Sequence, residues 1–412
     1  MPDTFEVKIE SLAYGGDGLG RLPDGRVTFV PYTIPGERVK IRLVEDKPKF
    51  SRAQLLEVLE SSPGRVEPRC QHFYTCGGCH YQHMDYAAQV EAKKMILQEQ
   101  LERIGGLHNL PQIDVVPAPV AWNYRNSIQF HLTQDGRLGF QKARSNQTFV
   151  IVECYLPEAG INLLWPQIEL EPIAGLERVS IRQGIDEELM IILESNDAAE
   201  VDFSIENLPV SIVQAGQSGF TVLAGSIHVM MAVLDRQFHV SAGSFFQVNS
   251  LQAQAMVQHL LGHLPLEKEM TVLDAYSGVG LFSAFLALKV KRLVGIEVSP
   301  QACEDFTINL DEFDHVELYE APVEQVLASV NFHPDVVVLD PPRAGLGSKV
   351  VEGVLAQGAK RLAYVSCDPA TLARDSQQLL AGGYQLNNLT LFDMFPQTYH
   401  VETVALMSRV KE

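Results

Sequence analysis

The C-terminal part of the chain alternates between short apolar runs and helical stretches from about residue 240 onward. Six runs have the apolar, β-branched composition of buried strands: TVLDAY, RLVGIEV, VELYEA, DVVVLD, RLAYVSC and TVALMS. Helical stretches separate the first five runs, and a strand–helix–strand unit of this kind places its two strands parallel in one sheet. The pattern therefore predicts a doubly wound, mostly parallel sheet whose ligands bind at the carboxyl ends of the strands.

The first of these strands leads into a glycine turn. The segment TVLDAYSGVGLFS (271–283) passes from an apolar strand through a Gly-x-Gly turn into a helix, which brings backbone N–H groups close to a bound ligand. Glu297 ends the next strand, where a carboxylate can hold the hydroxyls of a ribose. Ser283 replaces the third glycine of the dinucleotide fingerprint, which favours S-adenosylmethionine, and Tyr276 is expected to lie against this cofactor. A turn with only a structural role is the alternative.

Another strand end carries Asp340, in the segment DVVVLDPPRAG. The fourth strand of the sheet ends here, so we expect this carboxylate at the same ligand-binding edge. Pro341 and Pro342 stiffen the following loop and remove two backbone donors, which suits a flat pocket for a planar base. Enzymes of this fold that methylate amino groups commonly carry an aromatic residue after the prolines. Arg343 in that place argues against methylation of an exocyclic nitrogen.

Cys367 follows the fifth strand, in the segment VSCDPATLARD. A thiolate that adds to C6 of uracil makes C5 nucleophilic, and a base must then remove the C5 proton so that the thiol can leave. Glu402 in FPQTYHVETVALM is the predicted base, because an enclosed carboxyl can have its pKa raised towards neutrality. His400 is the rival, since residues two apart on a strand point the same way. The structural alternative is a cysteine that only packs, the role predicted for Cys303.

Four further cysteines have the spacing of a metal or cluster site: Cys70, Cys76, Cys79 and Cys154. The first three lie in CQHFYTCGGC, where two glycines let the backbone turn tightly between ligands. Four thiolates suit either zinc or an iron–sulfur cluster. The three-plus-one spacing favours a 4Fe–4S cluster with a structural role, because zinc knuckles usually pair two C-x2-C units. Two alternatives stay open. One is a zinc site that uses the neighbouring His72, His80 or His83, and the other is that the four thiols are free.

The N-terminal residues have the pattern of a small β-barrel. Short alternating strands are predicted in FEVKIESL, RVTFVPY, ERVKIRLV and SRAQLLEVLE, and the turn segments GGDGLG, PDG and IPGE separate them. Five short strands in about sixty residues suit a closed barrel of the OB-like type. Such barrels often bind single-stranded nucleic acid, and a purely structural barrel is the alternative.

The pattern divides the chain into three predicted domains. The barrel covers residues 1–60, and a central α/β domain with the cysteine set covers residues 61–84 and 119–238. Residues 85–118 and 239–412 form the domain with the parallel sheet. One amphipathic helix is expected in this last domain, in DYAAQVEAKKMILQEQLERIGG (85–106).

The charge of the chain bears on its partners. A net charge of −19 lowers the expectation of tight nonspecific binding to nucleic acid. The charge is uneven, however, because residues 36–52 hold six basic and three acidic side chains, and charge acts locally. The N-terminus lacks the features of a signal peptide, and the longest apolar stretch, 275–288, is too short and too broken by glycine to cross a bilayer. We therefore expect a cytoplasmic protein with no membrane partner.

Together these motifs closely resemble those of the RNA 5-methyluridine methyltransferase family, over nearly the whole chain. That family joins an N-terminal TRAM domain, a central domain with a 4Fe–4S cluster and a Rossmann-like methyltransferase domain. The resemblance rests on GGDGLGR, CQHFYTCGGC with Cys154, NYRNSIQF, SFFQVNS, DAYSGVG, GIEVS, LDPPRAG, VSCDP and HVETVALM. It implies cofactor contacts for four residues: Gln247, Tyr276, Glu297 and Asp340. It also implies Cys367 as the nucleophile, Glu402 as the base and the four cysteines as cluster ligands.

The resemblance implies an S-adenosylmethionine-dependent enzyme that methylates C5 of a uridine in structured RNA, with the target base flipped out of its stack. Members with both a TRAM domain and a cluster more often act on 23S rRNA than on tRNA, so 23S rRNA is the expected substrate. The resemblance implies no obligate protein partner. Leu281 stands where many members have an asparagine, and Pro322 stands near the place of another, so fewer side-chain hydrogen bonds to the cofactor are expected.

Two other functions stay open. A 5-methylcytosine enzyme of this fold typically has a second cysteine in the loop after the fourth strand, and the DPPRAG loop has none. The other alternative is a non-catalytic RNA-binding protein with a lapsed methyltransferase fold, which Leu281 and the acidic net charge favour. Binding of S-adenosylmethionine would distinguish it, because a lapsed site should bind none.

Overall fold

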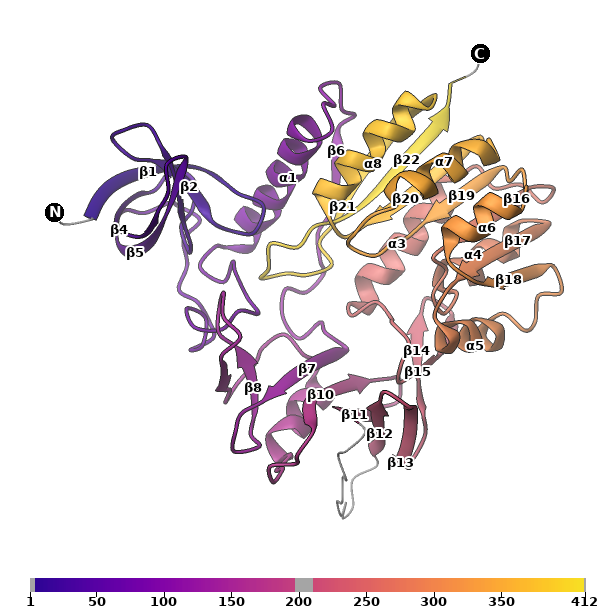
Figure 1. The fold of residues 1–412 in the computed structure, drawn as a ribbon, viewed down its shortest axis with the longest axis horizontal. Helices are drawn as coiled ribbons and strands as arrows, with labels where there is room; N and C mark the ends of the chain where they lie inside the picture. Colours follow the sequence, from indigo (N-terminus) through magenta and orange to yellow (C-terminus); the bar gives the residue numbers. More distant parts are fainter. Residues whose placement is uncertain (1–3, 197–209, 411–412) are drawn as a thin grey trace.

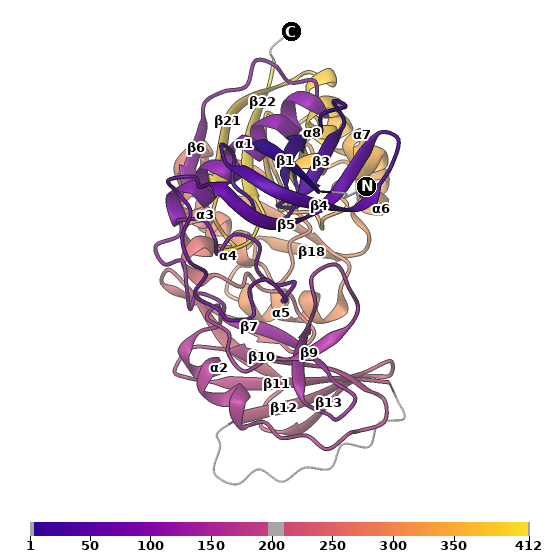
Figure 2. The same cartoon turned by 90° about the vertical axis from the view of Figure 1, so that its left-hand side faces the viewer.

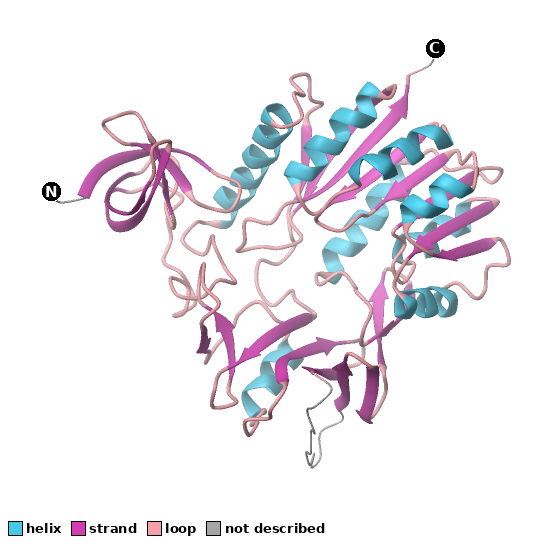
Figure 3. Cartoon of the chain, viewed as in Figure 1, coloured by secondary structure: helices cyan, strands magenta, loops and turns pink. Residues whose placement is uncertain are grey.

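The C-terminal part of the chain is built on one eight-stranded sheet (Figures 1 and 3). The computed structural model describes residues 4–196 and 210–410. The sheet has the order β18-β17-β16-β19-β20-β22-β21-β6. Its strands are β6 (Ile113–Val116), β16 (Thr271–Ala275), β17 (Arg292–Glu297), β18 (Val316–Glu320), β19 (Val336–Leu339), β20 (Arg361–Ser366), β21 (Tyr384–Phe392) and β22 (Glu402–Arg409). Neighbouring strands are parallel except where β22 pairs with β20 and β21.

Helices cover both faces of this sheet, and each face has its own apolar core. The helices are α1 (Tyr86–Arg103), α3 (Ser250–His263), α4 (Leu281–Leu286), η2 (Ala287–Lys289), α5 (Pro300–Asn309), α6 (Val323–Ser329), α7 (Gly347–Gln357) and α8 (Pro369–Ala381). One core joins the sheet to α1, α6, α7 and α8, and the other joins it to α3, α4 and α5. All four residues of β19 are buried, because both faces are covered. The predicted doubly wound, mostly parallel sheet is confirmed.

Two strands of this sheet have no clear signal in the sequence. β21 lies between α8 and β22 in the chain, and β6 comes from far upstream and pairs with β21 in parallel. The four-residue run of β6 is too short to show a period. Its place in the sheet is set by long-range pairing, such as that of Val116 with Phe392, rather than by local preference.

The N-terminal segment forms a closed five-stranded barrel, as predicted. Its strands are β1 (Thr4–Leu12), β2 (Gly18–Arg21), β3 (Val27–Val30), β4 (Arg38–Asp46) and β5 (Phe50–Glu60). Buried and exposed residues alternate along β1 and β4, so that side chains such as Val7 and Val39 fill the interior. The second half of GGDGLG, predicted as a turn, belongs to β2. Gly18 is required there, because a Cβ atom would lie 2.1 Å from the Thr33 hydroxyl.

The central part holds a second sheet (Figure 2) and a hairpin (Figure 1). The sheet has the order β13-β12-β11-β10-β7-β8-β9. Its elements and flanking helices are β7 (Ser127–Leu132), β8 (Leu138–Gln141), β9 (Thr148–Val150), α2 (Ala159–Leu164), η1 (Trp165–Gln167), β10 (Leu176–Gln183), β11 (Leu189–Ser195), β12 (Val210–Gly216) and β13 (Gly219–Ala224). The hairpin of β14 (His228–Val233) and β15 (Arg236–Ser241) packs against α3 and α5. The predicted boundary at 238 falls inside β15, and the domain division stays a prediction.

Helix α1 ties the segment that follows the cysteine motif to the parallel sheet. It packs against α8, and β6 follows it into the sheet. Asp85 caps its first turn by accepting a hydrogen bond from the Ala88 amide. On its buried face, Lys93 donates a 2.5 Å hydrogen bond to Asp393, and both side chains are fully buried. Within residues 4–196 and 210–410, no helix has the length and apolar character needed to span a bilayer.

Candidate active site

Five of the predicted site residues lie at one edge of the parallel sheet. Four of them stand at or just beyond the carboxyl ends of β16, β17, β19 and β20: Tyr276, Glu297, Asp340 and Cys367. Glu402 begins β22, which runs antiparallel to β20 and therefore starts at this same edge. Parallel strands end on one side of a sheet, so the fold alone brings residues from five segments together.

Cys367 and Glu402 are neighbours across two strands. The register of β20 and β22 pairs Ser366 with Thr403, and one step further it sets Cys367 opposite Glu402. The cysteine is partly exposed, whereas the Glu402 side chain is buried. An accessible thiol and an enclosed carboxyl therefore lie near each other, and the Glu402 charge acts on the thiol, as a nucleophile and its base require.

Burial and neighbouring charges set the electrostatics of this pair. Burial raises the pKa of Cys367 to about 12, and the carboxylates of Glu402 and Asp340 add to the shift. Burial and the Asp340 charge also raise the pKa of Glu402 well above its usual value. The Arg343 guanidinium opposes both shifts. At neutral pH the thiol is therefore protonated in this arrangement, and Glu402 has the raised pKa that suits a general base.

His400, the rival base, lies outside the strand. The sequence predicts that it points the same way as Glu402, but β22 begins only at Glu402. His400 belongs instead to the preceding loop, where the rings of Tyr399 and Phe395 lie 4.5 and 5.7 Å from its own. Burial lowers the pKa of His400 to about 3, and nearby cations such as Arg343 lower it further. An imidazole with so low a pKa is a poor proton acceptor, which favours Glu402.

The glycine turn faces open space beside Glu297. Gly278 has a φ of 54°, and nothing lies within 4 Å of the position that a Cβ atom would take there. The Glu297 carboxylate accepts hydrogen bonds from the backbone amides of Gly278, Val298 and Ser299, at 2.9, 2.7 and 2.8 Å. These bonds fix the carboxylate beside the turn, where the resemblance places the ribose of S-adenosylmethionine.

Asp274 belongs to the site, although the sequence prediction gives it no role. It lies in β16, two residues before Tyr276, and its side chain is 1% exposed. One of its oxygens accepts a 2.6 Å hydrogen bond from Ser283, while the other is buried and has no partner among the described residues. Burial raises the pKa of Asp274 to about 7, and the Glu297 charge adds to the shift. A buried oxygen without a partner can accept a hydrogen bond from a bound ligand. The signal was an acid just before the glycine turn.

Gln247 lies on the loop between β15 and α3, and its side chain is buried. Its backbone carbonyl accepts a 2.9 Å hydrogen bond from the Asn126 side chain, so the NYRNSIQF motif holds the SFFQVNS motif in place. The same loop approaches the start of α5, since a Cβ atom on Gly243 would lie 3.4 Å from Gln301. Tyr276 has a φ of 66°, a conformation that is uncommon for a large side chain and is concentrated at functional turns.

The two residues that depart from the family pattern, Leu281 and Pro322, lie at the starts of two helices. Leu281 begins α4, and its side chain is buried in one of the two cores of the sheet. Pro322 stands directly before α6 as its N-cap residue. Neither side chain can donate a hydrogen bond, so whatever holds a cofactor here must come from other residues.

The four cysteines of the predicted cluster line one cavity: Cys70, Cys76, Cys79 and Cys154. Burial raises the pKa of every one of these thiols, to about 11 for Cys70 and about 12 for Cys154. The charges of the other three add to the shift at Cys79, so the four are near neighbours. Among the described residues, however, no three cysteine, histidine or carboxylate side chains are grouped to hold a metal ion. The predicted cluster is therefore not confirmed.

The zinc alternative would need its ligands at about 2.0–2.3 Å from a single ion. Of the histidines considered for it, one has a ring nitrogen engaged in a hydrogen bond, and two pack against aromatic rings. His72 accepts a 3.1 Å hydrogen bond from the Val152 amide, and the His80 and Tyr399 ring centres lie 4.5 Å apart. His83 packs on Phe73, with ring centres 5.6 Å apart.

Cys303 lies outside this set. It is 4% exposed, in helix α5, and contributes to the buried apolar surface of the chain. The packing role predicted for it is confirmed.

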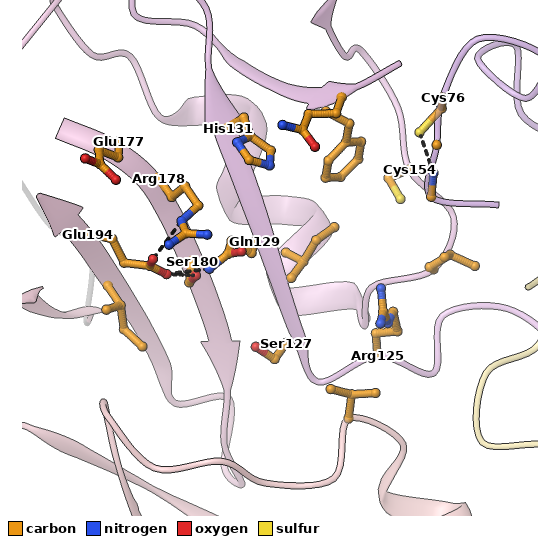
Figure 4. A pocket seen from close by; sticks show the side chains of 18 of the residues that line it. Cys76, Arg125, Ser127, Gln129, His131, Cys154, Glu177, Arg178, Ser180 and Glu194 are labelled. Carbon is orange, nitrogen blue, oxygen red and sulfur yellow. Dashed lines mark hydrogen bonds and ion pairs between the residues drawn. The ribbon is translucent and has the colours of Figure 1, made fainter. Parts of the chain in front are cut away.

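The cavity beside the cysteines has a volume of about 1260 Å³ and is bordered by the central sheet (Figure 4). Its charged lining has five cations and three carboxylates: Arg125, Lys142, Arg144, Arg178, Arg182, Glu153, Glu177 and Glu194. A local excess of cations in an acidic chain suits the backbone of a nucleic acid. The cavity does not include Cys367 in its described lining, but it reaches the loop of Gln247 through Phe245 and Val248.

Arg125 connects this cavity to the loop before Glu402. Its guanidinium carbon lies 5.9 Å from the centre of the Phe395 ring, and its buried Nε has no hydrogen-bond partner among the described residues. Two other cations of the cavity are engaged: Arg178 pairs with Glu194 at 2.8 Å (Figure 4), and Arg182 donates to two backbone carbonyls at 2.8 and 2.9 Å. Arg125 differs from these two in that none of the described residues gives its Nε a hydrogen-bond partner.

Two family models match the chain. The model of the TRAM domain matches residues 3–56. The model of tRNA (Uracil-5-)-methyltransferase matches residues 323–410, a segment that contains Asp340, Cys367 and Glu402. These two matches fall on the barrel and on the second half of the parallel sheet.

Relatives cover almost the whole chain. An uncharacterized RNA methyltransferase from Streptomyces avermitilis is 35% identical over 99% of this chain and 98% of its own. Another from Aquifex aeolicus is 34% identical over 98% of both. Among solved structures, the Pyrococcus abyssi tRNA (uracil-54, C5)-methyltransferase in complex with S-adenosyl-L-homocysteine matches with a TM-score of 0.75 and 27% identity, over 98% of this chain and 100% of its own. The chain belongs to the family of TRAM-containing RNA (uracil-5-)-methyltransferases.

Proposed function

We propose that the protein transfers a methyl group from S-adenosylmethionine to C5 of a specific uridine in structured RNA. The observation that carries this proposal is the placement of Cys367 opposite Glu402, at the sheet edge that also carries Glu297 and the glycine turn. Methylation at C5 needs a nucleophile to activate the ring and a base to remove a proton. This pair supplies both, whereas methylation of a nitrogen needs no such nucleophile.

The Cys367 sulfur acts first in the proposed reaction. The thiol gives its proton to solvent, and the resulting thiolate adds to C6 of the flipped uracil, so that the electrons of the C5–C6 double bond make C5 nucleophilic. Bound S-adenosylmethionine supplies the methyl group that C5 accepts. Glu402 then takes the C5 proton, the C5–C6 double bond forms again, and the sulfur leaves C6. The Arg343 charge favours the thiolate, because it lowers the pKa of Cys367.

Five residues are proposed to hold S-adenosylmethionine: Gln247, Asp274, Tyr276, Glu297 and Asp340. Glu297 would bind the ribose hydroxyls and Asp274 the amino group, since one carboxylate lies beside the turn and the other has an orphan oxygen. Burial and the Asp274 charge raise the pKa of Asp340 to about 7, as expected for a carboxyl enclosed at the same edge. The open space at Gly278 supports this assignment, and the P. abyssi relative was solved with S-adenosyl-L-homocysteine.

The RNA is proposed to lie against the cationic cavity and the barrel. Arg125 would take a phosphate, because it lines the cavity and stands between it and the loop before Glu402. The combination of a TRAM barrel with the cysteine set favours 23S rRNA. The P. abyssi relative, which matches this chain over its whole length, is a tRNA (uracil-54, C5)-methyltransferase. This supports tRNA as the second candidate.

We also propose that Cys70, Cys76, Cys79 and Cys154 hold a 4Fe–4S cluster with a structural role. All four thiols line one cavity, and Figure 4 shows Cys76 and Cys154 on the same side of it. A cluster of four irons presents a separate iron to each cysteine, so its ligands need not converge on one point. This is compatible with four neighbouring thiols that are not grouped around a single ion.

Methyl transfer to unmodified RNA tests the proposed function. The purified protein is incubated with methyl-labelled S-adenosylmethionine and with either 23S rRNA or tRNA transcribed without modifications. We expect the label in 5-methyluridine, in 23S rRNA and not in tRNA. Label in tRNA alone would establish the second candidate. Label in 5-methylcytosine would overturn the assigned chemistry, and a protein that binds no S-adenosylmethionine would indicate a lapsed enzyme.

A further inference from the structure

The barrel reaches the strand end that carries the proposed nucleophile. Tyr14 lies in the turn between β1 and β2, and its hydroxyl donates a 2.7 Å hydrogen bond to Oδ2 of Asp368. Asp368 directly follows Cys367 in the chain. We infer that Tyr14 is a positioning residue for Cys367, through which the RNA-binding barrel holds the thiol in place for attack. This inference rests on the proposed function and adds a role for the barrel in the chemistry.

Asp368 uses its two oxygens for two different tasks. Oδ1 accepts hydrogen bonds from the amides of Ala370 and Thr371, both at 2.9 Å, and so caps the first turn of α8. Oδ2 is the atom that takes the hydroxyl of Tyr14. The carboxylate therefore joins the start of α8 to the barrel, and the Cys367 backbone is held between this joint and the end of β20.

The Tyr14 ring also contacts the segment that leads to the proposed base. It meets the Tyr399 ring edge to face, with centres 5.8 Å apart. Tyr399 stands three residues before Glu402, and its ring is 4.5 Å from that of His80. Gly16 of the same barrel turn is packed here as well, since a Cβ atom would lie 3.5 Å from the Tyr399 ring. One turn of the barrel thus touches both catalytic segments.

The Tyr14 hydroxyl is suited to a lasting donor role. Burial raises its pKa above the usual value, and the hydrogen bond and the charge of Asp368 raise it further. The phenol therefore keeps its proton at every pH at which the protein would be assayed. A hydrogen bond to a charged acceptor is stronger than a neutral one, so its loss should be measurable in the rate.

Tyr14→Phe tests this role, because it keeps the ring and removes only the hydroxyl. With the RNA that the wild type methylates, we expect kcat to fall about tenfold, the effect of losing one hydrogen bond to a charged group. The KM for RNA and the Kd for S-adenosylmethionine should be unchanged. In the Glu402→Gln background, Tyr14→Phe should slow the formation of the covalent RNA adduct by a similar factor.

Tyr384→Phe is the matched control. It removes a buried 2.6 Å hydrogen bond from a tyrosine hydroxyl to the Ala359 carbonyl, near the start of β20 and away from the catalytic edge. We expect it to lower thermal stability and to leave kcat unchanged. If both variants lowered kcat alike, the effect of Tyr14 would be one of general stability, and the inference would be wrong.

Asp368→Asn provides a second variant. An asparagine can still cap α8 through its carbonyl oxygen, but it then presents an NH2 group to Tyr14, and this group cannot accept the hydrogen bond of the hydroxyl. Adding Tyr14→Phe to Asp368→Asn should lower kcat by much less than it does alone. The inference would be overturned if Tyr14→Phe lowered kcat by the same factor in the Asp368→Asn protein as in the wild type. A Tyr14→Phe protein with wild-type kcat would also overturn it. A wild-type protein without methylation would instead refute the proposed function.

Discussion

Cys367 and Glu402 stand opposite each other across the antiparallel strands β20 and β22, one step beyond the pairing of Ser366 with Thr403. They influence each other electrostatically, because the Glu402 carboxylate raises the pKa of the Cys367 thiol. Asp340 raises the pKa of both groups. The proposed nucleophile and base are therefore coupled, and a change in the charge of one should alter the reactivity of the other.

The first prediction concerns the reactivity of the thiol. Because the pKa of Cys367 is raised to about 12, its alkylation by iodoacetamide should become roughly tenfold faster per pH unit between about pH 7 and 9, as the thiolate fraction grows. Glu402→Gln removes a charge that raises this pKa, so the variant should react faster than the wild type at the same pH. Mass mapping of the peptide that contains Cys367 gives the rates, and a slower reaction in the variant would rule out the coupling.

The second prediction concerns cofactor binding by Asp274. Asp274→Asn removes the negative charge of the orphan oxygen, so the affinity for S-adenosylmethionine should fall roughly tenfold to a hundredfold, the range for a hydrogen bond between charged groups. Because the pKa of Asp274 is about 7, wild-type affinity should also weaken as the pH falls below that value, and the variant should show less of this dependence. Calorimetry measures both. The exposed Asp311, changed to Asn, is the control, and equal losses in both variants would remove Asp274 from the site.

The third prediction concerns the buried ion pair of Lys93 and Asp393, which joins α1 to the loop after β21. Lys93→Met leaves the Asp393 charge buried without its partner, so the free energy of unfolding should fall by about 3–5 kcal/mol. The neighbouring and less buried Lys94, changed to Met, should alter it by less than about 0.5 kcal/mol. Chemical denaturation measures both variants. A Lys93→Met protein as stable as the control would show that the pair does not stabilise the fold.

The fourth prediction concerns the cysteine set. After anaerobic reconstitution with iron and sulfide, the wild type should show the visible absorption and the iron and sulfide content of one 4Fe–4S cluster per chain. Changing Cys76 or Cys154 to Ser should abolish or strongly weaken it. Cys303→Ser should load normally, because this thiol lies in α5 outside the set. Zinc uptake without iron, or loading that survives loss of both cysteines, would refute the proposal.

The sequence predicts the parts of the fold that depend on local pattern. The strand–helix alternation from β16 to β20 fixes a parallel sheet, and with it the common edge of Glu297, Asp340 and Cys367. The barrel follows in the same way from short alternating strands and turn residues. Local pattern also marks the antiparallel strand that Glu402 begins, because residues 404–407 form a continuous apolar run.

Long-range contacts account for what the sequence does not predict. The four-residue β6 joins the sheet only because β21 offers it an edge, and no local period marks it. The position of His400 depends on where β22 starts, which the alternation of residues does not define. Tyr14 and Asp368 are 354 residues apart, and only the packing of the barrel on the methyltransferase domain brings them together.

The most direct test of the central claim is to trap the covalent intermediate. The Glu402→Gln variant can attack the uracil but cannot remove the C5 proton, so with RNA and S-adenosylmethionine it should accumulate a protein–RNA adduct that survives denaturation. Mass spectrometry should place the bond on the sulfur of Cys367, and the additional change Cys367→Ala should abolish the adduct while S-adenosylmethionine binding persists. An enzyme whose wild type methylates RNA, but whose Glu402→Gln variant forms no adduct at Cys367 or turns over at the normal rate, would contradict the account.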